Sequence, residues 1–268
     1  MHVSYSAIDL DKHGVCINSL ENHQIDIMHL SPSHHFPTGI ITPISRRYEL
    51  LGWASKDENR YIIEDDYDSE LRLGGKPIPT LQSIDVSDKV IYMNTFTKTL
   101  SSTVRISYMV LPASLTELFY KKLSFYSCTV SNFEQYTLAR FMESGSFEKH
   151  INRLRNYYQN KRDAILEIFK TAPLNQYITI KEEDSGVHFM MKLKTERTEM
   201  DMMSDSKSKG IKLAPLSKYF VGQTSNVNFQ NVYVMNYSSI DLEQLPLIFD
   251  ALCPVSYTHL TLPTNSRV

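Results

Sequence analysis

Cysteine and net charge are both scarce in this chain of 268 residues. The three cysteines are odd in number, lie far apart and lack metal-ligand spacing, which fits a reducing compartment: Cys16, Cys128 and Cys253. A formal net charge of −2 provides no global basic field for nucleic acid or an anionic membrane. The sequence shows neither a leader-like start nor an apolar run near the roughly 20 residues of a membrane span. We therefore expect a cytoplasmic protein without a membrane partner.

The first half of the chain alternates between strand-like and helix-like segments. Four short apolar runs rich in β-formers are typical of buried parallel strands: Ile25–Leu30, Tyr61–Ile63, Val90–Met93 and Ile106–Leu111. Between the first two, the segment Ile44–Lys56 interleaves apolar residues with Arg46, Arg47 and Glu49 in a helical pattern. Strand, helix and strand in this order predict a βαβ unit and a parallel sheet.

Polar clusters follow directly on two of these predicted strands. Glu64, Asp65 and Asp66 come after one strand, and the segment Thr95–Lys98 comes after another. Ligand crevices of open α/β sheets form beyond the carboxyl ends of the strands. We therefore expect both clusters to face one crevice.

The second half of the chain has a different pattern. A helical stretch from Leu115 is followed by a long, charged one from Ser131 to Phe169. Three further strands and two helices are then expected: 177–181, 187–193 and 232–237 as strands, and 198–208 and 241–252 as helices. The second half thus predicts a small α+β lobe.

Lys98 is the most informative single residue. It lies between two apolar runs, where we expect a buried strand end, and burial there is costly for an ammonium group. Such a lysine loses its proton more readily and can form a Schiff base with an aldehyde. The hydroxyls of Thr95 and Thr97 and the guanidinium of Arg105 flank it and suit a phosphate on that aldehyde. The alternative is an ordinary solvated loop lysine.

The segment Tyr61–Glu70 places five carboxylates within seven residues. A solvated acidic loop or a metal cluster is one interpretation. A more specific one uses Asp65 and Tyr67: a buried aspartate can hold a pyridine nitrogen protonated, and a phenol can hydrogen-bond a phenolate oxygen. Both needs belong to pyridoxal 5′-phosphate (PLP).

These motifs carry a family resemblance. The chain resembles the aminotransferase-like domain of MocR-type (GabR-like) regulators in five stretches of the same order and spacing: Ser31–Gly39, Ser45–Ala54, Tyr61–Glu70, Lys76–Gln82, and Phe96–Leu100 through Arg105–Pro112. Similarity continues in Glu143–His150, Arg155–Tyr158 and Ser185–Phe189, and it covers nearly everything from Ile8 to Leu252. The resemblance implies the type I PLP-dependent transferase fold, an α/β class. Residues 1–140 would form a partial large domain with a mainly parallel sheet, and 141–253 a small α+β domain.

The resemblance also implies a role for each motif residue. Lys98 matches the Schiff-base lysine, Asp65 the partner of the pyridinium nitrogen, and Tyr67 the donor to the phenolic oxygen of the cofactor. The phosphate would be held by Arg105, with hydroxyl contacts from Thr95 or Thr97.

One cofactor contact of related enzymes is replaced. Aminotransferases of this fold commonly have asparagine where this chain has Phe36, so its contact to the cofactor is missing or comes from a neighbouring histidine, His35. We do not expect His34 and His35 to bind metal, because adjacent side chains diverge and no third ligand is suitably spaced.

Four departures from the family shape the functional prediction. The chain has no counterpart of the winged helix-turn-helix domain, so we expect DNA binding only through a domain outside it. The upstream part of the large domain, with its phosphate loop and stacking aromatic, also has no counterpart. No arginine lies in Val232–Ser239 to grip a substrate carboxylate. Residues 254–268 read as a foreign or disordered tail, and the whole as a fragment.

Three functions are compatible with these residues. The family motifs favour the effector-sensing domain of a PLP-dependent transcriptional regulator, joined to PLP as an internal aldimine at Lys98. The alternative is a catalytically active class I/II aminotransferase acting on an amino acid, with Lys98 as general acid and base. The third is a remnant that binds nothing. The expected partners are a small amine or amino acid effector and, in the full-length protein, a second copy in a homodimer.

Overall fold

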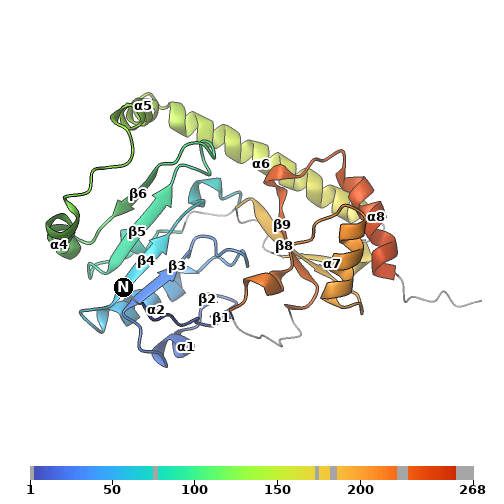
Figure 1. Ribbon diagram of the computed structural model, residues 1–268, viewed down its shortest axis with the longest axis horizontal. Coiled ribbons are helices and arrows are strands. Elements are labelled where there is room, and N and C mark those ends of the chain that lie inside the picture. Colours follow the sequence, from blue (N-terminus) through green and yellow to red (C-terminus); the bar gives the residue numbers. More distant parts are fainter. Residues whose placement is uncertain (1–2, 75–77, 173–174, 182–185, 222–228, 258–268) are drawn as a thin grey trace, which may run out of the picture. The chain divides into compact units, whose positions relative to one another are not determined.

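The computed structural model describes residues 3–74, 78–172, 175–181, 186–221 and 229–257 (Figure 1). The chain divides into two compact units. The first comprises residues 1–36, 40–156 and 184–186, and the second 37–39, 157–183 and 187–268. Helix α6 (Ser146–Thr171) contributes residues to both units. The division falls within this helix, after Asn156, and thus later in the chain than the expected boundary at residue 140.

A four-stranded sheet forms the centre of the first unit (Figure 1). Its order is β3 (Ile27–Leu30), β4 (Tyr61–Asp65), β5 (Val90–Thr95) and β6 (Ser107–Val110). The first three strands are parallel, which confirms the predicted βαβ unit. The fourth was predicted to be buried and parallel, and this is wrong: β6 is exposed and antiparallel to β5. The connection through residues 96–106 is too short for a parallel crossover.

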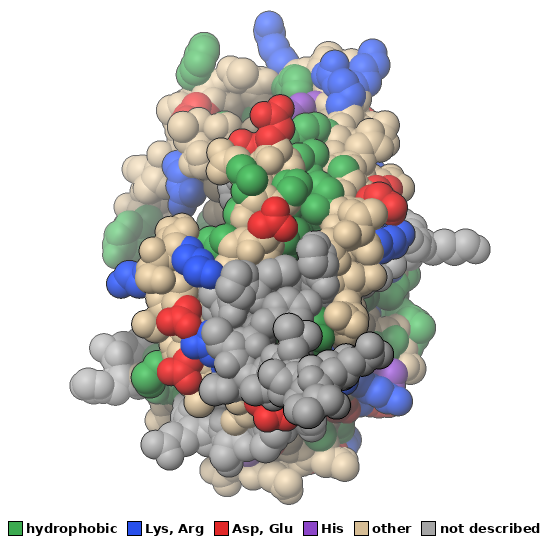
Figure 2. All heavy atoms as spheres, turned by 90° about the vertical axis from the view of Figure 1, so that its right-hand side faces the viewer, with side chains coloured by type: hydrophobic (Ala, Val, Ile, Leu, Met, Phe, Trp, Pro, Cys, Tyr) green, Lys and Arg blue, Asp and Glu red, His purple; other side chains and the backbone are tan. Residues whose placement is uncertain are grey.

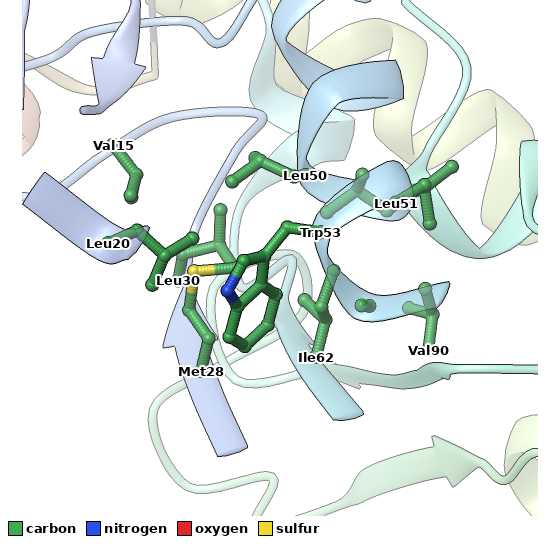
Figure 3. Packing of buried hydrophobic residues seen from close by; sticks show 11 residues of the cluster. Val15, Leu20, Met28, Leu30, Leu50, Leu51, Trp53, Ile62 and Val90 are labelled. Atoms are coloured by element: carbon green, nitrogen blue, oxygen red, sulfur yellow. The ribbon is translucent and has the colours of Figure 1, made fainter. Parts of the chain in front are cut away.

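Helix α2 (Ile44–Ser55) covers one face of this sheet, as predicted. Figure 3 shows Trp53 of α2 pointing toward Met28 of β3 and Ile62 of β4. These residues belong to one buried cluster: Val15, Leu20, Met28, Leu30, Leu50, Leu51, Trp53, Ala54, Ile62, Leu81 and Val90. The polar positions expected on α2 need one correction. Arg47 is fully buried and Tyr48 is 58% exposed, because buried acceptors draw the arginine inward.

The remaining elements of the first unit are short or solvent-facing. They are β1 (Leu10–Asp11), β2 (Gly14–Val15), α1 (Ile17–Glu21), η1 (Ser69–Leu71), α3 (Leu81–Ile84), α4 (Ala113–Leu123) and α5 (Asn132–Glu143). The long helical stretch predicted from Ser131 to Phe169 is two helices, because Gly145 adopts a φ of +68° between α5 and α6. A capping box of Ser131 and Glu134 starts α5.

The second unit is the predicted α+β lobe. Its antiparallel sheet has the order β7 (Ile178–Lys181), β8 (His188–Leu193), β9 (Val232–Asn236). The described residues of this unit also form η2 (Asn175–Tyr177), η3 (Leu216–Tyr219), η5 (Tyr237–Ser239), α7 (Glu199–Ser208) and α8 (Leu245–Tyr257). Aromatic rings fill its core: the Phe169 ring lies 4.5 Å from that of Phe249, and Phe189 stacks on Tyr237 at 5.7 Å.

Charges of both signs are interspersed on the face shown in Figure 2, around a patch of hydrophobic side chains. Helices α7 and α8 expose Met200 and Leu247, which are 80% and 68% accessible. Within the described residues, no helix combines the length and apolar character needed to cross a bilayer. Helix α8 extends to Tyr257, so residues 254–257 of the expected tail are helical, and 258–268 lie outside the described residues.

Candidate functional site

The two polar clusters predicted at one crevice do begin at the same sheet edge. Strands β4 and β5 are parallel neighbours, with Asp65 in register with Met93, so their carboxyl ends lie together. The acidic cluster nevertheless divides between two faces, because side chains alternate along a strand. Glu64 and Asp66 are buried, at 0% and 2% exposure, whereas the Asp65 side chain is 36% exposed. Of the three carboxylates, Asp65 is the one that faces solvent at this edge.

Asp65 already lies beside a protonatable ring nitrogen. Its Oδ2 is 3.4 Å from Nε2 of His29, which is on the neighbouring strand β3 and is 62% exposed. The hydrogen bond with this carboxylate raises the pKa of His29 above its ordinary value. The surroundings of Asp65 thus favour the protonated form of a ring nitrogen.

Lys98 lies in the turn that follows β5, and its side chain is exposed. The expectation of a buried strand end is therefore wrong: β5 ends at Thr95, and the chain turns outward before reaching the lysine. The Phe96 N–H donates to the Ile106 carbonyl oxygen at 2.9 Å and closes the loop.

The two predicted threonines hold this loop in shape. Thr97 Oγ1 donates to the Val104 carbonyl oxygen at 3.0 Å, and Thr95 Oγ1 lies within 3.2 Å of the Ile106 carbonyl oxygen and 3.0 Å of Thr97 Oγ1. Arg105 is exposed at the returning end of the same loop. The closed loop thus presents two cationic side chains, Lys98 and Arg105, at its surface.

Tyr67 is positioned by a buried pair that the sequence did not reveal. Its hydroxyl donates to the His34 carbonyl oxygen at 3.1 Å. The His34 ring in turn places Nδ1 2.7 Å from Oδ2 of buried Asp68. Burial raises the pKa of Tyr67, which keeps the phenol protonated and able to donate. His35 is half-buried, and burial lowers the pKa of its ring, so the neutral form is favoured.

Comparison with solved structures shows the fold. The chain matches a kynurenine aminotransferase from Pyrococcus horikoshii with a TM-score of 0.78 and 24% identity, over 95% of this chain and 64% of that one. It matches a multiple substrate aminotransferase from Thermococcus profundus with a TM-score of 0.77 and 25% identity, over 93% and 62%. The expected type I PLP transferase fold is therefore confirmed. No family model matches the chain.

Curated relatives identify the family. The chain is 40% identical over 210 residues to the uncharacterized HTH-type transcriptional regulator YdeL of Bacillus subtilis (strain 168), a match covering 78% of this chain and 45% of the relative. It is 30% identical over 215 residues to the probable rhizopine catabolism regulatory protein MocR of Rhizobium meliloti, covering 80% and 42%. This chain is a MocR-type aminotransferase-like domain. It spans about half the length of the curated relatives that it matches.

A buried polar network in this MocR-type domain lies next to the carboxyl end of β4 and fixes the segments around it. Arg47 donates to the carbonyl oxygens of Pro32, Thr42 and Pro79 at 3.0 to 3.1 Å and lies 3.5 Å from Glu64. Glu64 also accepts the main-chain N–H groups of Leu81 and Gln82 at 2.8 and 2.9 Å. The network ties the segments before and after β4 to helix α2, and its only local signal in the sequence is the acidic residue at the end of a predicted strand.

Proposed function

We propose that this MocR-type domain binds PLP through Lys98 and senses a small amine or amino acid on behalf of a transcriptional regulator. The observation that carries the proposal is the shared sheet edge, where Asp65 and the cationic loop of Lys98 and Arg105 start from neighbouring strands. The relatives support the regulatory role, since proteins 40% and 30% identical to this chain are named as regulators.

The residues at the edge fit the cofactor. Bound PLP supplies an aldehyde, a phosphate and a pyridine ring that withdraws electrons when protonated. Asp65 would hold the proton on that ring nitrogen, as it favours protonated His29. The exposed amine of Lys98 would take the aldehyde, and the Arg105 guanidinium the phosphate.

Four further residues would complete the cofactor site. Tyr67, kept protonated by burial, would donate to the phenolic oxygen of PLP. Thr95 and Thr97 would offer hydroxyl oxygens to the phosphate and keep the loop closed. His35, with its favoured neutral ring, would replace the asparagine contact that Phe36 cannot make.

A working aminotransferase is the second candidate. An aromatic-amino-acid aminotransferase from Thermococcus litoralis is 27% identical to the chain over 239 residues, and an exposed Lys98 amine could also move a substrate proton. The segment of strand β9 and turn η5 argues against turnover, because residues 232–239 contain no arginine to clamp a substrate carboxylate.

We place the longer protein in the cytoplasm as a homodimer that contacts DNA through a domain outside this chain.

Titration of the purified chain with PLP tests the proposal. Binding through Lys98 should give a yellow protein whose visible band is lost in Lys98→Ala and kept in Lys122→Ala, an exposed lysine of α4. An unchanged band in Lys98→Ala would rule out this lysine. Addition of amino acids with a keto acid then separates the two candidates: the sensor predicts one spectral change without turnover, whereas sustained product formation identifies an aminotransferase.

A further inference from the structure

A cavity of about 280 Å³ lies within the first unit and apart from the proposed cofactor residues. None of Lys98, Asp65, Tyr67, Arg105 or His35 lines it. Three acidic residues, Asp66, Asp68 and Glu70, line it together with two arginines, Arg72 and Arg155. Its volume lies just below the range of roughly 300–1,000 Å³ that is usual for small-molecule pockets, so it suits a compact ligand.

A chain of hydrogen bonds fixes two carboxylates in the wall. The Tyr92 hydroxyl donates to Oδ2 of Asp66 at 2.8 Å. Asn94 Nδ2 donates to the Tyr92 hydroxyl oxygen and to Oε1 of Glu70, each at 3.1 Å. Asp66 and Glu70 are therefore held through one oxygen each by the same pair of side chains.

The second oxygen of each carboxylate lacks a donor. Asp66 is 2% exposed, and its Oδ1 is buried without a hydrogen-bond partner in the described part of the chain. Oε2 of Glu70 is likewise buried and unpartnered there. Buried polar atoms rarely lack a hydrogen-bond partner, so we expect a ligand in the cavity to supply a donor to these oxygens. A metal ion is a poor fit, since no three metal-ligating side chains among the described residues are suitably grouped.

The two arginines of the wall have the opposite requirement. Arg72 donates through Nε to the Gly74 carbonyl oxygen at 3.0 Å, and Arg155 donates through Nε to the Glu70 carbonyl oxygen at 2.5 Å. Among the described residues these are the only hydrogen bonds of their side chains, so the terminal guanidinium nitrogens can still donate to an acceptor. Guanidinium nitrogens match a carboxylate well. The cavity thus fits a small molecule that carries both a positively charged hydrogen-bond donor and a negatively charged acceptor.

We propose that this cavity binds a free amino acid as its zwitterion, with the ammonium group on Asp66 and Glu70 and the carboxylate on Arg72 and Arg155. The site requires neither PLP nor Lys98. Burial raises the pKa of Glu70, and a bound ammonium group would oppose that shift by favouring the carboxylate.

Calorimetry on the PLP-free chain tests the proposal, with each of the twenty L-amino acids as titrant. At least one amino acid should bind to the cavity. Methylammonium and acetate should each bind to the cavity at least about tenfold more weakly than that amino acid, because methylammonium lacks the carboxylate and acetate lacks the ammonium group, with their charge-assisted bonds. Asp66→Asn and Glu70→Gln should each weaken binding by at least about tenfold for the same reason. Glu117→Gln, an exposed position on α4, is the matched control and should leave the affinity unchanged.

A second measurement keeps the proposal testable if Asp66→Asn does not fold. In the wild-type chain, the main-chain amide NMR signals of residues 66–72 and 92–94 should shift most on addition of the amino acid. Shifts centred on the Lys98 loop, or binding that disappears in Lys98→Ala, would overturn the proposal. Absence of binding by all twenty amino acids would also overturn it and leave the cavity to water. A colourless PLP titration, in contrast, would overturn only the proposed function.

Discussion

The substitution Arg47→Met tests how the sheet edge is supported. Arg47 is fully buried and bridges three main-chain carbonyl oxygens and Glu64. Its distance of 3.5 Å from Glu64 is at the long end for an ion pair. Glu64, in contrast, receives two main-chain N–H groups at 2.8 and 2.9 Å. The arginine therefore acts chiefly as the donor to three carbonyl oxygens, and one of them, that of Pro32, also accepts the Thr42 N–H at 2.8 Å.

Methionine keeps most of the side-chain volume and removes every donor. An acceptor left unsatisfied by such a change costs about 1–3 kcal/mol when buried, and breaking a buried charged pair costs about 3–5 kcal/mol. We expect Arg47→Met to lower the free energy of unfolding by about 4 kcal/mol, because local rearrangement relieves part of the sum. Glu64→Gln should cost about 1–3 kcal/mol, because the amide NH2 that replaces one carboxylate oxygen cannot accept the main-chain N–H that this oxygen holds.

The penalty should also depend on pH in a defined direction. Burial raises the pKa of Glu64, while the nearby Arg47 lowers it. Without the arginine the folded-state pKa rises further above the unfolded value, so the folded state favours the protonated carboxyl. The loss in Arg47→Met should therefore be smallest in acid and grow as pH rises through the folded-state pKa of Glu64.

Urea unfolding followed by tryptophan fluorescence measures these effects. Trp53 is the only tryptophan, is 2% exposed and belongs to the same helix as Arg47. Arg153→Met, at an exposed position of α6, is the matched control and should change stability by less than about 0.5 kcal/mol. If Arg47→Met lost less than about 1 kcal/mol, the assignment of Arg47 as the shared donor would be refuted.

Three further predictions concern the loop, the edge and the Tyr67 support. His29 should titrate by NMR above its ordinary pKa, and Asp65→Asn should lower that pKa; the pair should stabilise the fold below pH 6.5 and lose this effect as pH rises through the folded-state pKa. Thr97→Val should cost about 1 kcal/mol in urea unfolding by removing a hydrogen bond inside the loop, and an unchanged midpoint would argue against it. Gly186→Ala should cost about 1–3 kcal/mol, because φ is +60° and a Cβ would clash with the buried ring of His34; equal stability would show that the packing there is loose.

Local sequence patterns predicted the elements better than their orientations. The periodicity of Ile44–Lys56 was sufficient to predict α2, and the apolar runs to predict β3, β4 and β5. The direction of β6 follows from the length of its connection to β5, which the pattern of the strand itself does not contain. The burial of Arg47 was not predicted for a related reason. Three of its hydrogen-bond partners are main-chain oxygens, whose positions the residue types do not reveal.

The shared position of the two polar clusters was predictable from the sequence, and their contacts were less so. Strand ends in the sequence placed Asp65 and the Lys98 loop at one edge, which the register of β4 and β5 confirms. The alternation of side chains between the two faces of β4 would have been sufficient to predict that Asp65 faces away from Glu64 and Asp66. The contacts of His29 with Asp65 and of His34 with Asp68 join residues over 30 positions apart, so no local pattern signals them.

The most direct test of the central claim is to locate the bond between PLP and the protein. Borohydride reduction of the PLP-saturated chain makes a bond between the aldehyde and an amine permanent, and peptide mass spectrometry then identifies the modified lysine. We predict a single pyridoxyl adduct on the peptide containing Lys98, with no adduct at other lysines in Lys98→Ala. Adducts spread over exposed lysines such as Lys121 and Lys122, with Lys98 unmodified, would contradict the account.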